Sequence, residues 1–197
     1  MPEKPYAPSC DRNRDPILEV LREVLDKPAD VLELGSGTGQ HAVYFAHALP
    51  HLCWQTSERA EECAGVRVWL DEAQLPNTPP PLILNVAGDW PKRQFDAVFT
   101  ANTLHIMSWP QVETLFARVP AVLHAGGQLI VYGPFNYGGH FSSDSNAAFE
   151  QWLKARGAHM GIRDFEAVDA LAQQAGLRLV EDRTMPANNR CVIWSRR

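Results

Sequence analysis

The sequence has little positive charge and no long apolar run. Eighteen Lys and Arg residues stand against 23 Asp and Glu, which gives a net charge of −5. Basic side chains that contact phosphates supply most of the affinity of nucleic-acid-binding proteins, so this balance argues against DNA or large RNA as a partner. No apolar stretch approaches the ~18 residues that a membrane-spanning helix needs, and we therefore expect no membrane association.

Cysteine is also scarce, and it follows no known metal-binding pattern. None of the four cysteines forms a C-x-x-C pair, and no histidines lie at zinc spacing. We therefore expect free thiols and no metal site. The first residues, MPEKPYAPSCDRNRD, contain no apolar signal region, so the sequence favours a cytoplasmic location.

The remaining composition is that of a globular domain. Of the 197 residues, 45% are hydrophobic and 21% charged, which predicts one domain over residues 1–197. Helical and strand patterns alternate, and this predicts an α/β, Rossmann-like, doubly wound sheet that is mostly parallel with an antiparallel C-terminal strand. The predicted strands are 30–34, 52–57, 81–86, 95–101, 128–132, 177–184 and 190–195. The predicted helices begin at Asp15-Pro16, after the glycine loop, and near residues 60, 108, 146 and 165.

The most informative segment is DVLELGSGTGQH, residues 30–41. A strand leads into a glycine loop and then into a helix, an arrangement that lets a ligand touch bare backbone and free amides. The dinucleotide pattern G-x-G-x-x-G fails because Gln40 occupies the third glycine position. The alternative is G-x-G-x-G after Glu33, a strand carboxylate that needs a partner such as a cationic ligand.

The segment V-L-E-L-G-S-G-T-G resembles the first motif of the class I S-adenosylmethionine (SAM)-dependent methyltransferases, and the order of elements matches over nearly the whole chain. The resemblance implies a SAM cofactor, with Glu33 reaching the methionine amino group and the loop lining methionine and ribose through Gly35, Ser36, Gly37 and Gly39. The features S-C-D-R-N-R-D-P-I-L, G-T-G-Q-H-A and M-P-A-N-N resemble a methyltransferase-like branch of unknown substrate.

The resemblance also implies cofactor roles at the ends of the next three strands. Glu58 directly follows the second predicted strand and lies 58 − 39 = 19 residues past Gly39, a spacing that suits an acid binding the ribose hydroxyls. Asn85 and Val86 would lie beside the adenine, with Asp89 as an alternative to Asn85. Asn102, at the end of the fourth strand, would meet the methionine end of SAM.

Three residues are candidates for the chemistry itself. His105 follows the fourth strand and is the first candidate for a general base, because histidine titrates nearest neutral pH. His140 is the second candidate. Tyr132 could cover the cationic cofactor, since aromatic faces attract cations, or could belong to the core.

The acceptor is expected to meet two other segments. Arg12 and Asn13 could bind an anionic acceptor or the SAM carboxylate, or could be ordinary solvated residues. Residues 134–163, which include Asn136 and Tyr137, interrupt the alternation of strands and helices and carry glycines and aromatics. We predict that this insertion forms a lid or wall on the substrate side.

The sequence therefore favours SAM-dependent methyl transfer to a small-molecule acceptor, with no metal. Two alternatives remain open, namely a non-catalytic SAM-binding protein on the same fold and, less favoured, a nicotinamide-dependent oxidoreductase. The sequence leaves the acceptor, the methylated atom and the oligomeric state open.

Overall fold

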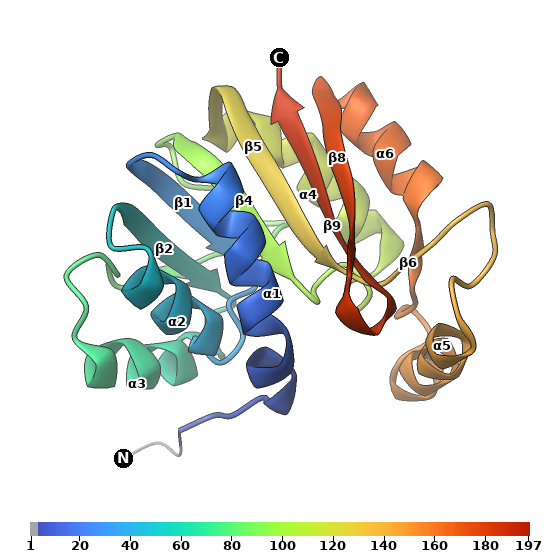
Figure 1. The fold of residues 1–197 in the computed structure, drawn as a ribbon, viewed down its shortest axis with the longest axis horizontal. Helices are drawn as coiled ribbons and strands as arrows, with labels where there is room; N and C mark the ends of the chain where they lie inside the picture. The colour runs from blue at the N-terminus through green and yellow to red at the C-terminus, as the bar shows by residue number, and fades with distance from the viewer. Residues whose placement is uncertain (1–3) are drawn as a thin grey trace.

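The structure is a computed structural model that describes residues 4–197, and its centre is a seven-stranded sheet (Figure 1). The sheet strands are β1 (Ala29–Leu34), β2 (Leu52–Glu58), β3 (Leu82–Ile83), β4 (Phe95–Ala101), β5 (Leu123–Gly133), β8 (Leu177–Met185) and β9 (Asn189–Arg196). They lie in the order β3-β2-β1-β4-β5-β9-β8. β1 to β5 are parallel, whereas β9 is antiparallel to β5 and β8, so the predicted fold class is confirmed.

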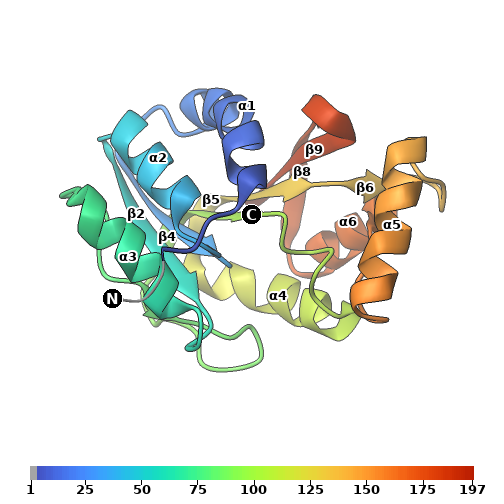
Figure 2. The ribbon, with the colours of Figure 1, turned by 90° about the horizontal axis from the view of Figure 1, so that it is seen from below.

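Helices cover both faces of this sheet (Figure 2). They are α1 (Pro8–Val24), α2 (Gln40–Ala48), α3 (Cys63–Ala73), α4 (Trp109–Val122), α5 (Asp144–Arg156) and α6 (Phe165–Gln174). Helices α1 to α3 pack on one face and α4 with α6 on the other, and α5 lies beyond the edge of the sheet. A two-stranded ribbon of β6 (Phe135–Asn136) and β7 (Arg163–Asp164) leads to and from α5.

Two apolar clusters hold the layers together. Val31 and Trp54 face α1 and α2, whereas the alternate residue Leu32 faces α4. On the α4 face, the Phe116 ring meets the Trp194 ring edge-on at 5.7 Å. Each such fully buried side chain contributes roughly 1.5–3 kcal/mol to folding, and this two-sided burial explains the continuous apolar strands in the sequence.

Helix α1 begins two turns earlier than the sequence predicted. It starts at Pro8, and Pro16 lies inside it. A proline is favoured in the first turn of a helix because its missing N–H has no intrahelical partner there, and Pro8 satisfies this rule as well as Pro16 does. The additional turns carry Cys10 and Asn13, which bear on the site described below.

Strand β3 is shorter than predicted, with two residues in place of 81–86. The reason is a turn in which Asn85 Oδ1 accepts a hydrogen bond from the Ala87 N–H at 3.0 Å. The predicted capping box of α4 is confirmed, since Gln111 Oε1 accepts from the Ser108 N–H at 2.8 Å. Within residues 4–197, no helix is both long enough and apolar enough to cross a membrane.

Candidate active site

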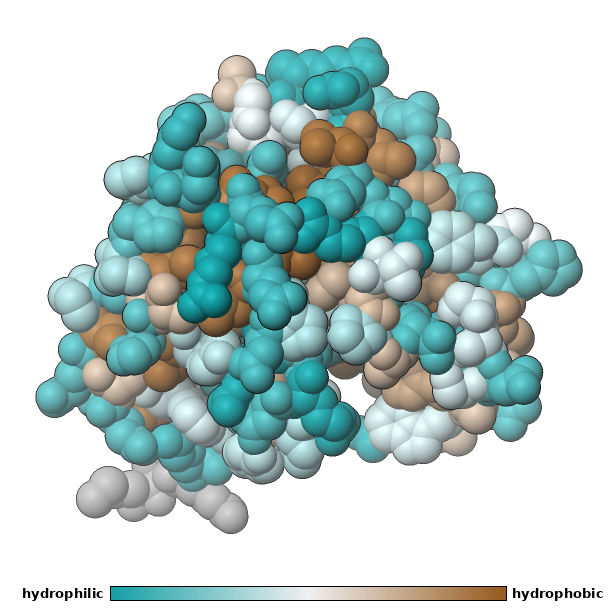
Figure 3. Space-filling model, viewed as in Figure 1, coloured by the Kyte–Doolittle hydropathy of each residue, from teal (hydrophilic) through white to brown (hydrophobic). Residues whose placement is uncertain are grey.

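The carboxyl ends of the parallel strands border a cavity of about 780 Å³. Figure 3 shows the surface hollowed between the lower end of α1 and the part that contains α5. The walls come from the N-terminal segment, the glycine loop, the ends of β2, β3 and β4, and the segment after α5. Among the lining residues are Ser9, Cys10, Gly35, Ser36, Gly37, His41, Glu58, Asn85, Val86, Asn102, Ile106, Met107, His159 and Met160.

The three loop glycines have different roles. All adopt left-handed φ angles, +68° at Gly35, +57° at Gly37 and +91° at Gly39. A Cβ added at Gly37 would meet nothing within 4 Å, so this backbone faces the open cavity. A Cβ at Gly39 would lie 3.3 Å from the Val66 backbone, and Gly39 does not line the cavity. Gly39 therefore permits the close approach of α3, which gives no support to its predicted contact with the cofactor.

Glu33 lies just beneath the loop and is only 2% exposed. Its Oε2 accepts hydrogen bonds from Ser36 Oγ at 2.8 Å and Trp54 Nε1 at 3.1 Å. Burial, with a smaller contribution from the Glu58 charge, raises the pKa of Glu33 to about 7. No Lys or Arg among residues 4–197 forms an ion pair with it. Such a carboxyl suits a cationic ligand group.

Glu58 lines the cavity and also fixes the glycine loop. Its Oε2 accepts from the Gly37 N–H at 2.8 Å, and its Oε1 accepts from the Arg59 N–H at 2.9 Å. Each carboxylate oxygen accepts more than one hydrogen bond, so Glu58 retains capacity for a ligand hydroxyl.

The other predicted cofactor residues lie at the same edge. Asn85, Val86 and Asn102 line the cavity, whereas Asp89 does not. Asn102 has a φ of +58°, and its N–H donates to the Tyr132 carbonyl at 2.8 Å. A left-handed residue other than glycine at the end of a buried strand is typical of a functional site.

None of the three predicted chemical residues lines the cavity. His105 is buried, its ring meets Phe149 edge-on at 5.3 Å, and burial together with the Arg163 charge lowers its pKa to about 4. Tyr132 is buried in β5, and burial raises its pKa to about 12. His140 is exposed in a turn.

The predicted substrate residues also lie outside the lining. Arg12 is exposed, and Asn13 is buried with its Oδ1 2.7 Å from His41 Nε2. Asn136 is buried in β6, and its Oδ1 has no partner among residues 4–197. The Tyr137 hydroxyl donates to Asp182 at 2.7 Å, which raises its pKa together with burial.

Sequence reasoning missed two walls of the cavity. Ile106, Met107 and Met160 form an apolar wall opposite the glycine loop, and the predicted insertion contributes to it only through its last residues, including His159. The N-terminal segment forms the other wall, because the Ala7 N–H donates to Gln40 Oε1 at 2.6 Å. The only signal for this second wall was Gln40 in place of a glycine.

Comparison with known proteins assigns the chain to a family. A family model described as a protein of unknown function, DUF938, matches residues 4–196. The chain belongs to the DUF938 family.

Solved structures similar to this DUF938 chain are methyltransferases. An O-methyltransferase family protein from Burkholderia thailandensis has a TM-score of 0.83 and 16% identity, over 95% of this chain and 57% of that one. Human N-acetylserotonin methyltransferase in complex with SAM gives 0.79 and 15%, over 95% and 52%. The DUF938 chain thus spans little more than half the length of either protein. These likenesses confirm the resemblance to SAM-dependent methyltransferases at the level of the fold.

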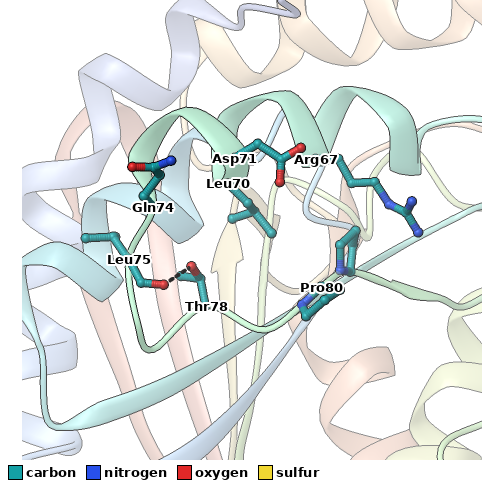
Figure 4. A pocket seen from close by; sticks show the side chains of 8 residues that line it. Arg67, Leu70, Asp71, Gln74, Leu75, Thr78 and Pro80 are labelled. Atoms are coloured by element: carbon teal, nitrogen blue, oxygen red, sulfur yellow. Dashed lines mark hydrogen bonds between the residues drawn. The ribbon is translucent and has the colours of Figure 1, made fainter.

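A second hollow of about 800 Å³ in the DUF938 chain lies along α3 and the loop after it (Figure 4). It contains no predicted site residue; its floor includes Leu70, and Thr78 Oγ1 donates to the Leu75 carbonyl at 3.1 Å. In the described part of the chain, no group of three or more His, Cys, Asp or Glu residues is placed to hold a metal ion.

Proposed function

We propose that this DUF938 protein binds SAM and transfers its methyl group to a small-molecule acceptor. The observation that carries the proposal is a buried carboxyl, Glu33, that has two hydrogen-bond donors but no cation partner among residues 4–197. It lies beneath a loop whose Gly37 backbone faces an open cavity. A cationic amino acid end and a nearby polar ribose fit this pair of features.

The residues that would hold the cofactor follow the strand order. Glu58, at the end of β2, would accept the ribose hydroxyls, and Asn85 with Val86, after β3, would lie by the adenine. The methionine part would then extend over β1 and β4, between Glu33 and Asn102. When bound, SAM supplies a methyl group that is already activated as a sulfonium, so the chief task of the chain is to position the acceptor.

The lining of the cavity favours a small acceptor. The N-terminal segment and the residues after α5 approach it from two sides, and an enclosed site of this kind suits a small molecule better than a folded macromolecule. In this proposal residues 1–197 act as one methyltransferase domain, and the insertion 134–163 supplies part of the acceptor wall. A base is required only if the acceptor loses a proton in the transition state.

Two other functions use the same fold. A SAM-binding protein without transfer is consistent with the absence of His105, Tyr132 and His140 from the cavity lining. A nicotinamide-dependent oxidoreductase is disfavoured, because Gln40 replaces the required glycine and its side chain is occupied by the Ala7 N–H. We rank methyl transfer above both.

Calorimetry with SAM, with its demethylated product S-adenosylhomocysteine (SAH) and with NADH tests this proposal. We expect SAM and SAH to bind and NADH not to bind. Incubation with methyl-labelled SAM and a panel of small phenols, amines and thiols then separates transfer from binding alone. Tight binding of NADH without SAM binding would overturn the proposal.

A further inference from the structure

One buried histidine on the cavity wall has no role in the function proposed so far. His41 lies in the first turn of α2, lines the cavity and is 7% exposed. Its ring stacks on Phe45 with a centroid separation of 5.2 Å. Its Nε2 lies 2.7 Å from Asn13 Oδ1, an oxygen that can only accept, so Nε2 carries the proton. The lone pair of the neutral ring is therefore on Nδ1.

That lone pair is poorly used within the described residues. The hydrogen-bond contact of Nδ1 among residues 4–197 is Cys10 Sγ at 4.0 Å, a long contact to a weak donor. Burial keeps the imidazole neutral by lowering its pKa to about 4, and the Arg14 charge acts in the same direction. Burial also raises the pKa of Cys10 to about 11, so this Cys–His pair is not an activated thiolate.

The Glu33 carboxyl borders the same end of the cavity. Its charge helps to raise the pKa of Cys10, and it accepts a hydrogen bond from Trp54, which packs in the cluster beneath α1 and α2. Glu33 and His41 thus present two hydrogen-bond acceptors on either side of one thiol. An ammonium group has three N–H donors and a positive charge, so it can satisfy both acceptors at once.

We infer that His41 is a second binding residue for the α-ammonium group of the cofactor, alongside Glu33, and that Asn13 is the residue that orients it. The inference rests on the proposed function. It gives Asn13 a role through His41 in place of the acceptor contact predicted from the sequence.

The test compares SAH with its desamino analogue, which lacks only the α-amino group. In His41→Leu we expect the affinity for SAH to fall about tenfold or more, as for other hydrogen bonds to charged groups, and the affinity for the analogue to change less than twofold. His47→Leu, the same change at an exposed position of α2, should leave both affinities unchanged.

Each outcome is decisive. A selective loss of SAH affinity supports the inference, whereas equal losses for both ligands, or none, overturn it. If the analogue binds normally, the variant is folded, and His41→Gln, which retains an acceptor oxygen, should recover part of the SAH affinity. Failure of the unchanged protein to bind SAH would instead contradict the proposed function.

The role of Asn13 has its own readout. The titratable and charged groups around the imidazole are Asp11, Cys10 and Arg14 on α1, with Glu33 on β1 beyond Cys10. In Asn13→Asp a carboxylate would face Nε2 and favour the charged imidazole, which repels an ammonium. Relative to the unchanged protein, SAH affinity should then begin to fall at a higher pH, and an identical pH profile would refute the role of Asn13. Glu33 titrates in both proteins, so the difference reports His41.

Discussion

The two sides of the cavity are built differently. On the glycine-loop side, short polar contacts join residues of β1 and β2, as where the Ser57 hydroxyl donates to the Glu33 carbonyl at 2.7 Å. The opposite side is held by one long side chain, because the Arg163 guanidinium donates to the carbonyls of Leu104 and His159, each at 3.1 Å, and to that of Met107. The first side is a local motif, whereas the second depends on segments about 60 residues apart.

This difference suggests how the family separates its tasks. A local motif fixes a cofactor site, whose ligand is the same for every acceptor. A wall assembled from Ile106, Met107 and Met160 can change residue by residue without disturbing the loop, because these residues share no hydrogen bond with it. The four predictions below, ordered by the size of the expected effect, test whether the two sides are independent.

Gly37→Val should abolish detectable binding of SAH, which means a loss of more than about 100-fold. The valine side chain would enter the open cavity where the ligand should touch the backbone. Gly138→Val is the matched control, since Gly138 has the same φ of +57° but lies outside the cavity. Calorimetry on both variants, with circular dichroism to check folding, makes the measurement. Equal SAH affinity in the two would contradict the site.

Glu58→Ala should weaken SAH by about 10- to 150-fold, the range expected for hydrogen bonds to a charged group worth about 1.5–3 kcal/mol. The variant loses the ribose contact and also the anchor of the Gly37 N–H. Glu58→Gln retains an acceptor oxygen for that N–H, so its smaller loss separates the two roles. Calorimetry would show a change below twofold in Glu58→Ala if this carboxylate served the loop alone.

Glu33→Gln should weaken SAH by about tenfold yet stabilise the free protein above pH 7. The pKa of Glu33 is about 7 in the fold against 4.5 in the unfolded chain, so its ionisation costs stability as pH rises through that window. Removing this cost should add roughly 2–3 kcal/mol to the free energy of unfolding at pH 8 and little at pH 4. Urea unfolding at both pH values measures this difference, and a destabilised variant at pH 8 would contradict the account.

Arg163→Ala should have the smallest effect on the cofactor. It removes the bonds that join the loop at 104–107 to the segment after α5, so hydrogen exchange should speed up in residues 104–107 and 157–163. Exchange in residues 33–39 and the affinity for SAH should change less than twofold. Faster exchange throughout the glycine loop would show that the two sides are coupled.

The sequence could predict what short-range chemistry determines. The motif from Glu33 to Gly39 predicted a strand, a loop and a helix, and the structure brings Glu58, Asn85 and Asn102 to the same edge because parallel strands align their carboxyl ends. The sheet order and its antiparallel strand were likewise predictable from the alternation of elements.

Residues whose roles depend on distant contacts were not predictable. His105 has the sequence position of a base, but Phe149, more than 40 residues away, buries it. Asn13 was interpreted as a possible acceptor contact because the helix seemed to begin at Pro16, and the extra turns of α1 turn it toward His41. Gln40 looked like a missing glycine, and only the fold shows that it holds the Ala7 N–H.

The position of β9 between β5 and β8 has a consequence for how the chain folds. During synthesis the ribosome releases β8 before β9, yet β8 has no neighbour in the sheet until β9 exists. The two strands must therefore pair first as a hairpin, through the tight turn at Pro186–Asn188, and then dock together against β5. Until that step the edge of β5 stays unpaired, so the hairpin closes a sheet whose glycine loop, translated more than 130 residues earlier, can already have formed.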